Sequence, residues 1–262
     1  MKKNKYKILV LSDLKKSTDS ILKSTVSLAN IIEGDIEFFH VKKPLEVVNK
    51  ENQLSAIRTI NDEYITSNKA IKKLVKPISE AYSLKLNYKV VIGNLKDEIS
   101  KRIKAYKPDI IILGKRKQKL LGLGDKTIKF VFENFKGAIM VASDKNFLEP
   151  NKNLLLGVLN SNITNLNTQF VKDLLEHTQK PLKEFHLGEE SSDSGHNMNT
   201  IKTVKYVFDK GSNTIQNLSN YLEKSNVNLL YLDRNNKGVL NELSKPELYK
   251  VINKLNVSLL VA

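Results

Sequence analysis

Glycines and basic side chains are concentrated in the segment 114–125, which follows a short apolar run. Glycine lets the backbone approach a bound group closely, and lysine and arginine attract phosphate. A helix that starts after such a segment offers unpaired amide groups and a dipole, and both favour an anion. The segment contains Gly114, Lys115, Arg116, Lys117, Lys119, Gly122 and Gly124. It therefore indicates a phosphate site.

Asp125 favours a different interpretation of the same segment. It stands at the expected N-cap of a helix over 126–135, where its carboxylate would accept hydrogen bonds from the helix amides and repel a phosphate. Two interpretations therefore stay open. One is a phosphate site that survives beside Asp125, and the other is a capped helix whose basic neighbours are only solvated.

Short apolar runs alternate with helix-like stretches through the first half of the chain. The runs are apolar at nearly every position, as strands of a parallel sheet with helices on both faces must be. Asp13 ends the first run and Val41 ends the second, and open α/β sheets bind ligands at the carboxyl ends of their strands. We expect strands over 6–12, 36–41, 84–92, 109–113 and 138–141, and helices over 21–32 (stopped by Gly34), 54–80, 95–106 and 126–135.

The second half repeats this plan with one deletion. Its early segments match the first half at an offset of about 146 residues and its last segment at about 120, so about 26 residues are missing between them. The shortfall falls where the long helix would be, and a polar loop is expected there. The loop is 189–199, the linker between the halves is 144–152, and the predicted domains are 1–145 and 151–262, the second being a trimmed copy of the first.

The composition is that of a globular protein, with 262 residues of which 40% are hydrophobic and 27% charged. The net charge of +15 lies mainly in residues 1–150, which carry 30 Lys and Arg against 17 Asp and Glu. A surface that attracts anions therefore belongs to the first half. The absence of cysteine excludes disulfides, thiolate metal sites and cysteine nucleophiles. No apolar stretch has the length of a signal-peptide core or a membrane span, so we expect a cytoplasmic protein.

The four histidines do not form a catalytic or metal-binding group in the sequence. His40 and His186 occupy equivalent strand positions of the repeat, which favours a structural role. His177 and His196 have no carboxylates at ligand spacing. Because the chain also lacks a nucleophile elbow, a Walker loop and a dinucleotide fingerprint, we expect a protein that is not an enzyme.

The strand that ends in Asp13, the strand that ends in His40 and Val41, and the glycine-bounded basic segment resemble the universal stress protein family. The resemblance covers nearly the whole chain as a tandem pair. It implies an α/β fold with two five-stranded parallel sheets flanked by helices, of the Rossmann-like, adenine nucleotide alpha hydrolase-like type. ATP-binding members carry Gly-x2-Gly-x9-Gly-Ser/Thr after the fourth strand. Gly114 matches the first glycine, Lys117 stands at the second, and Gly124-Asp125 can take the last pair only if the loop is shortened.

The resemblance implies a stress-response protein with weak binding of ATP or another adenine nucleotide in the first domain, and no metal beyond nucleotide-associated magnesium. Asn160 and Asp233 stand in the second copy where the first has Asp13 and Gly114, so no site is expected there. The resemblance also implies that the two domains form an intramolecular pseudo-dimer, and a homodimer of whole chains stays open. The nucleotide site would comprise Asp13, Val41, Gly114, Lys115, Arg116, Gly122, Gly124 and Asp125.

A second function class uses the same basic segment differently. Lys115 to Lys119 could bind a polyanion or nucleic acid, which would make the protein a scaffold with no nucleotide site. Single-stranded nucleic acid is usually bound with aromatic side chains on which bases stack, and this segment has none. The sequence therefore favours the nucleotide interpretation and disfavours nucleic acid.

Overall fold

The structure is a computed structural model that describes residues 5–14, 17–43, 53–115, 126–160, 169–188, 202–234 and 251–262. Contacts divide the chain into two units, Met1–Gly137 and Ala138–Ala262, called unit 1 and unit 2 below. Within the described ranges, no helix has both the length and the apolar character needed to cross a membrane. The domain limits expected from the sequence, 1–145 and 151–262, stay a prediction.

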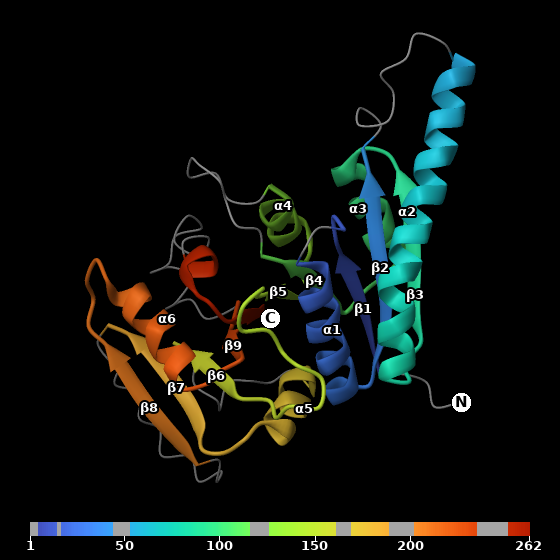
Figure 1. Cartoon of the computed structure of the whole chain (residues 1–262). Coiled ribbons are helices and arrows are strands. Elements are labelled where there is room, and N and C mark those ends of the chain that lie inside the picture. The colour runs from blue at the N-terminus through green and yellow to red at the C-terminus, as the bar shows by residue number, and fades with distance from the viewer. Residues whose placement is uncertain are drawn as a thin grey trace. The chain divides into compact units, whose positions relative to one another are not determined.

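The described strands of unit 1 form a parallel sheet in the order β3-β2-β1-β4 (Figure 1). The expected strands and helices of this part are all present, with ends that move by up to three residues. In chain order the elements are β1 (Tyr6–Leu11), α1 (Thr18–Ile32), β2 (Gly34–Lys42), α2 (Gln53–Ala81), β3 (Leu86–Ile92), α3 (Leu95–Tyr106), β4 (Ile110–Gly114) and α4 (Lys126–Asn134).

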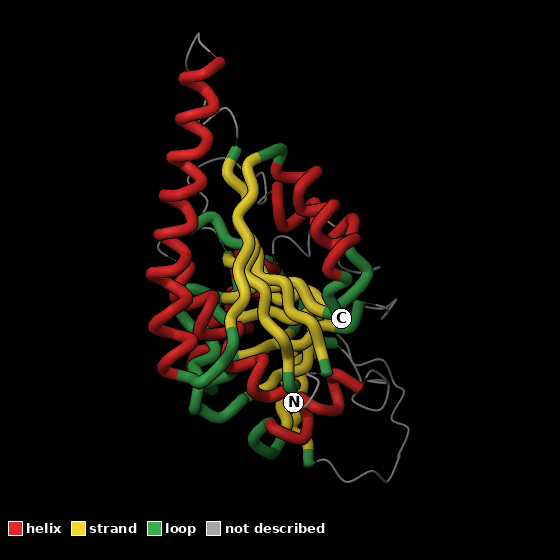
Figure 2. Tube along the Cα trace, turned by 90° about the vertical axis from the view of Figure 1, so that its right-hand side faces the viewer, coloured by secondary structure: helices red, strands yellow, loops and turns green. Residues whose placement is uncertain are grey.

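The order of these strands fixes where a ligand can bind. From β1 the chain moves outward through α1 to β2 and through α2 to β3, and α3 then returns it to β4 on the other side of β1. Right-handed connections place α1 and α2 on one face of the sheet and α3 and α4 on the other, and contacts link α1 with α2 and α3 with α4. Figure 2 shows the longest helix, α2, running along one side of the strands. The strand order therefore reverses between β1 and β4, because the chain adds β2 and β3 on one side of β1 and β4 on the other. This reversal leaves a crevice at the carboxyl ends of β1 and β4.

The central strands are buried on both faces, as expected for a parallel sheet. The exposed fraction is 0% for four of their side chains, Ile8, Val10, Ile111 and Ile112, and helices cover them from both sides. This packing makes β1 and β4 a rigid base for the residues that follow them.

The end of α1 differs from the expectation. Glu33, not Gly34, ends the helix in a left-handed conformation with φ of 55°, and its amide donates to the carbonyl of Ala29. Gly34 instead begins β2, where a Cβ would lie 2.6 Å from Cδ1 of Ile8. Close packing of β2 against β1 therefore explains this glycine, and helix termination does not.

Unit 2 contains the strand order β5-β10-β9-β6-β7-β8. The order β9-β6-β7-β8 has the same chain connections as β4-β1-β2-β3, and these strands are parallel. Only the pair β5–β10 is antiparallel among the described pairs of this unit, and it adds to the parallel sheets that the sequence predicts. The elements are β5 (Ala138–Ala142), β6 (Leu156–Leu159), α5 (Gln169–His177), β7 (Leu182–Leu187), β8 (Thr203–Phe208), α6 (Thr214–Lys224), β9 (Leu229–Leu232) and β10 (Ser258–Val261).

One strand of unit 2, β8, was not predicted from the sequence. The patterning predicts no strand over Thr203–Phe208, yet β8 pairs with β7 along its whole length. β8 is a largely exposed edge strand that contains Thr203 and Lys205, so it lacks the continuous apolar run that identifies the central strands. The predicted loop 189–199 lies outside the described residues.

Candidate functional site

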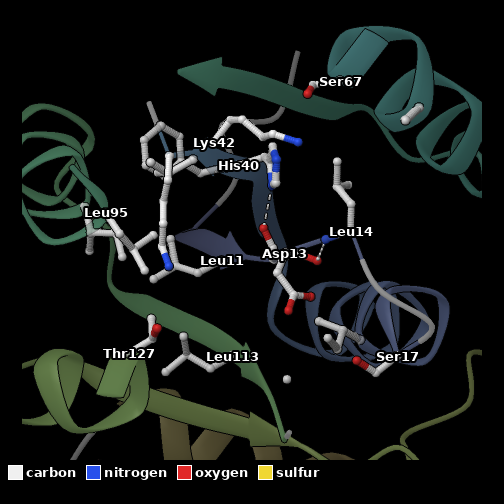
Figure 3. Close-up of a pocket in the computed structure, with 18 of the residues that line it drawn as sticks. Leu11, Asp13, Leu14, Ser17, His40, Lys42, Ser67, Leu95, Leu113 and Thr127 are labelled. Carbon is white, nitrogen blue, oxygen red and sulfur yellow. Dashed lines mark hydrogen bonds between the residues drawn. The ribbon is translucent and has the colours of Figure 1, made fainter. Parts of the chain in front are cut away.

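A cavity of about 370 Å³ lies in unit 1 at the carboxyl ends of β1, β2 and β4. We call it the strand-end pocket (Figure 3). Three residues singled out from the sequence line it together: Asp13 after β1, Val41 near the end of β2, and Gly114 at the end of β4. The volume falls within the range of about 300 to 1,000 Å³ that small-molecule sites occupy. The fold therefore places a ligand-sized cavity where the strand order reverses, between β1 and β4.

The turn after β1 positions Asp13. Ser12 Oγ accepts a hydrogen bond from the amide of Leu14 at 3.2 Å, and lies 3.0 Å from Oγ1 of the buried Thr18. Leu14 adopts a left-handed conformation with φ of 60°. Serine two residues before the accepted amide is a common way to close such a turn. The serine turn thus holds the Asp13 carboxylate toward the pocket (Figure 3).

His40 fastens this turn to β2. Its Nδ1 lies 2.8 Å from the carbonyl oxygen of Ser12, and the side chain is only 5% exposed. Because a carbonyl oxygen can only accept, Nδ1 carries the hydrogen and donates it. The contact gives His40 the structural role that the sequence favoured, although the residue also lines the strand-end pocket.

Gly114 has a packing reason that is independent of any ligand. A Cβ at this position would lie 2.1 Å from Cδ1 and 3.0 Å from Cγ1 of Ile21 on α1, so the Ile21 side chain would have to move to accommodate it. Thr127, the second residue of α4, lines the pocket on the same side. The first turn of α4 is therefore near the cavity, and helix N-terminal amides favour an anion there.

The remaining candidate residues of the basic segment are not brought to the pocket by the described structure. Lys115 follows β4 and is half-buried, but it is not among the residues that line the cavity. Arg116, Gly122, Gly124 and Asp125 lie outside the described residues. Whether they complete a phosphate site stays a prediction.

One wall of the strand-end pocket was missed by the sequence analysis. It is a face of α2 that carries Glu63, Thr66, Ser67 and Ala70. These residues have the spacing i, i+3, i+4 and i+7, which places them on one side of a helix. A polar and small-residue stripe on an otherwise amphipathic helix is the signal that could have identified them. Lys42 of β2 extends from the neighbouring strand and pairs with Glu63 at 3.3 Å from Nζ to Oε2.

The pocket combines apolar surface with hydrogen-bonding and charged groups. Leu11, Leu95 and Leu113 contribute apolar area, and the polar side chains are hydroxyls, the His40 imidazole, two carboxylates and lysines. Among the residues that the structure describes, no group of three or more histidine and acidic side chains could hold a metal ion. The arrangement suits a flat, partly apolar ligand with polar edges.

The equivalent strand end in unit 2 is built differently. Asn160 takes the place of Asp13, and its Oδ1 accepts a hydrogen bond from the amide of Leu187 at 2.7 Å. The backbone amide of Asn160 donates to the carbonyl of Phe185, also at 2.7 Å. The side chain that could contact a ligand is therefore used to join β6 to β7.

Solved structures of universal stress proteins share this fold. A universal stress protein from Archaeoglobus fulgidus DSM 4304 is 15% identical, with a TM-score of 0.63 over 98% of this chain and 96% of the other. A putative universal stress protein from Pseudomonas aeruginosa UCBPP-PA14 is 11% identical, with a TM-score of 0.54 over 98% of this chain and 92% of the other. The expected universal stress protein fold is thus confirmed.

The remaining comparisons with known proteins give no information about this site. A universal stress protein family protein from Arabidopsis thaliana, solved with AMP bound, is 15% identical over 52% of this chain and 90% of the other; its TM-score of 0.33 supports no argument about this site. No protein-family model and no curated protein matches the sequence.

Proposed function

We propose that this chain is a tandem universal stress protein that binds one adenine nucleotide in the strand-end pocket without hydrolysing it. The observation that carries the proposal is the convergence of Asp13, Val41 and Gly114 on one cavity of about 370 Å³ at the point where the strand order reverses. The sequence selected these three residues independently of the cavity. Their convergence on a ligand-sized space supports a binding role for each.

The two ends of the pocket suit different parts of a nucleotide. Asp13 and the end of β2 offer hydrogen-bonding groups beside apolar side chains, which suits a base. Gly114 and Thr127 lie at the other end, near the start of α4, which suits phosphate. We therefore place the base between β1, β2 and α2, with the phosphate directed toward α4.

A binding role without turnover fits the groups that are present. Phosphoryl transfer depends on a residue that orients the attacking group and on a metal-binding side chain. The described lining has no such pair aimed at the α4 end. His40, which could act as a base elsewhere, donates its Nδ1 hydrogen to a backbone carbonyl. Binding would instead stabilise unit 1 by an amount that rises with the logarithm of ligand concentration, which is how a sensor of nucleotide level can work.

Unit 2 is proposed to be a partner for unit 1 in the cytoplasm and to bind no nucleotide. Its strand order β9-β6-β7-β8 follows that of β4-β1-β2-β3, which supports a duplication. Asn160 is committed to the amide of Leu187 and so offers little to a ligand. With the predicted domain limits of 1–145 and 151–262, β5 belongs to the first domain and β10 to the second, so their antiparallel pair would serve as the intramolecular counterpart of a dimer contact.

Isothermal titration of the full chain with ATP and AMP tests the proposal. Asp13→Ala should weaken binding at least about tenfold, because a hydrogen bond to a charged group is lost. Asp35→Ala is the matched control, since Asp35 is an exposed carboxylate at the opposite end of β2. Absence of binding to the parent protein would refute the proposal, as would equal losses in the two variants. ATP hydrolysis that Asp13→Ala abolishes would refute the non-catalytic role.

A further inference from the structure

We infer that Glu63 and Ser67 of α2 read the edge of the bound base and make the strand-end pocket prefer adenine over a 6-oxo purine. The inference rests on the proposed nucleotide-binding function and assigns base selection to residues of the long helix. The resemblance implied neither residue, and neither lies at a strand end.

The position of the two side chains supports this role. Glu63 and Ser67 are one helical turn apart on the face of α2 that lines the pocket. They lie on the β2 side of the cavity, where we place the base, and away from Thr127 at the start of α4. Figure 3 shows the Ser67 hydroxyl on the same side of the pocket as Lys42 and His40.

Ser67 is a buried polar group within reach of a ligand. It is 6% exposed, and it lines the strand-end pocket. Buried hydroxyls normally have a partner, because burial without one is unfavourable. A buried hydroxyl beside a cavity is suited to a ligand atom.

Glu63 is held in place by Lys42. Lys42 Nζ lies 3.3 Å from Oε2 of Glu63, and the two side chains are 27% and 34% exposed. The ion pair orients the carboxylate, which lines the pocket. Glu63 therefore presents an acceptor, and Ser67 presents a donor, on one wall of the base end.

This pair of groups complements adenine. Along one edge adenine carries an amino group, which donates, beside ring nitrogens, which accept. A 6-oxo purine has an acceptor oxygen in place of the amino group, and this oxygen would face the carboxylate. A carboxylate opposite an acceptor leaves both groups without a partner in a partly desolvated site. Adenine is therefore favoured.

The test compares AMP with IMP, because the two ligands share sugar and phosphate and differ at position 6 of the base. Isothermal titration of the full chain should show AMP binding at least about tenfold more tightly than IMP, the usual scale for one charge-assisted hydrogen bond. Glu63→Gln should reduce this ratio to about threefold or less, because a glutamine amide can both accept and donate. Ser67→Ala should weaken AMP about threefold to tenfold.

Two control variants separate base reading from charge. Glu80→Gln on the same helix changes the net charge equally, but Glu80 pairs with Lys76 at 3.7 Å, and those side chains are 67% and 66% exposed. It should leave the AMP to IMP ratio unchanged. Lys42→Met should lower the AMP to IMP ratio less than Glu63→Gln does, because Lys42 acts only by positioning the Glu63 carboxylate. Lys76→Met is the control for this variant.

The outcomes distinguish this inference from the proposed function. A parent protein that binds neither AMP nor ATP refutes the proposed function. If the parent protein binds AMP but Glu63→Gln leaves the ratio of AMP to IMP affinity unchanged, only the base-reading role is refuted. Tighter binding of IMP than of AMP also overturns the inference, and would indicate that Lys42 donates to the 6-oxygen instead.

Discussion

Arg102 of α3 binds Glu37 of β2 through two parallel hydrogen bonds. Nε donates to Oε1 at 2.5 Å and Nη2 donates to Oε2, while the two side chains are only 18% and 9% exposed. The guanidinium also lies over the ring of Tyr106. Bidentate pairs of this kind are among the stronger hydrogen-bonded contacts in proteins. The pair joins α3 to the strand that carries His40 and Val41 to the strand-end pocket.

Arg102→Met should destabilise the protein by about 2–4 kcal/mol, because it leaves the buried Glu37 carboxylate without its partner. Urea denaturation at neutral pH measures this. Lys101→Met on the same helix is the control, since Lys101 is 71% exposed and pairs with Glu98 at the surface. Its expected cost is under about 1 kcal/mol. Equal losses in the two variants would contradict the buried-pair argument.

The fold of unit 1 was predictable because its strands are apolar on both faces. Ile110–Leu113 illustrates this, since a continuous apolar run next to glycine has few alternatives to a central parallel strand. Thr203–Phe208 illustrates the limit. Thr203 and Lys205 interrupt its apolar residues and most of its side chains are exposed, so its pairing with β7 depends on long-range contacts that a local pattern does not contain.

The candidate site was predictable only at the strand ends. Asp13, Val41 and Gly114 were expected at one sheet edge because parallel strands end together. Glu63 and Ser67 were not, because their approach to the pocket depends on where the long helix α2 packs against the sheet. Gly114 shows a further difficulty, since its contact with Ile21 gives it a structural reason that no motif comparison reveals.

Tyr106 should make the protein less stable at high pH. Burial, followed by the nearby charges of Glu37 and Asp35, raises the pKa of Tyr106 to about 12. A tyrosine in the unfolded chain ionises near pH 10, so the folded state holds the proton more tightly. This contribution is fully present below about pH 10 and is lost as the pH rises toward 12.

Unfolding free energies measured from pH 8 to 12 check this expectation. Tyr106→Phe should lose less stability over this interval than the parent protein does. Tyr64→Phe, at an exposed position on α2, should follow the parent curve. A Tyr106→Phe curve that also follows the parent would show that Tyr106 does not contribute to the alkaline loss.

Ser258 should matter for the pairing of β5 with β10. Its Oγ accepts a hydrogen bond from the amide of Ser143 at 3.1 Å, and both residues are at most 1% exposed. Ser258→Ala leaves this buried amide without its partner, at a cost of about 1–3 kcal/mol. Denaturant titration should show the loss, with Ser225→Ala, at a half-buried helix end, as a control that stays within about 0.5 kcal/mol. A Ser258→Ala variant as stable as the control would contradict the prediction.

One nucleotide should bind per chain, weakly, and in unit 1. Only unit 1 presents a carboxylate, Asp13, at the end of its first strand, whereas Asn160 at the matching position of unit 2 is bonded to the amide of Leu187. Weak binding follows from Lys117 and Asp125, which stand where the resembled motif has a glycine and a hydroxyl residue. Each lost hydrogen bond reduces affinity about tenfold to a hundredfold. The basic first half should partly compensate, so affinity should fall as salt rises.

Isothermal titration with ATP at low and high salt gives the stoichiometry and the salt dependence together. We expect one site per chain and an affinity that decreases severalfold between the two conditions. Asp125→Ser should tighten binding about tenfold, because it removes a carboxylate that repels phosphate and supplies a hydroxyl donor. Glu149→Ser makes the same change in charge at a residue paired with Lys152 in unit 2, and should leave the affinity unchanged. Two sites per chain or tight binding that ignores salt would refute the prediction, and an Asp125→Ser variant no better than its control would remove this explanation for weak binding.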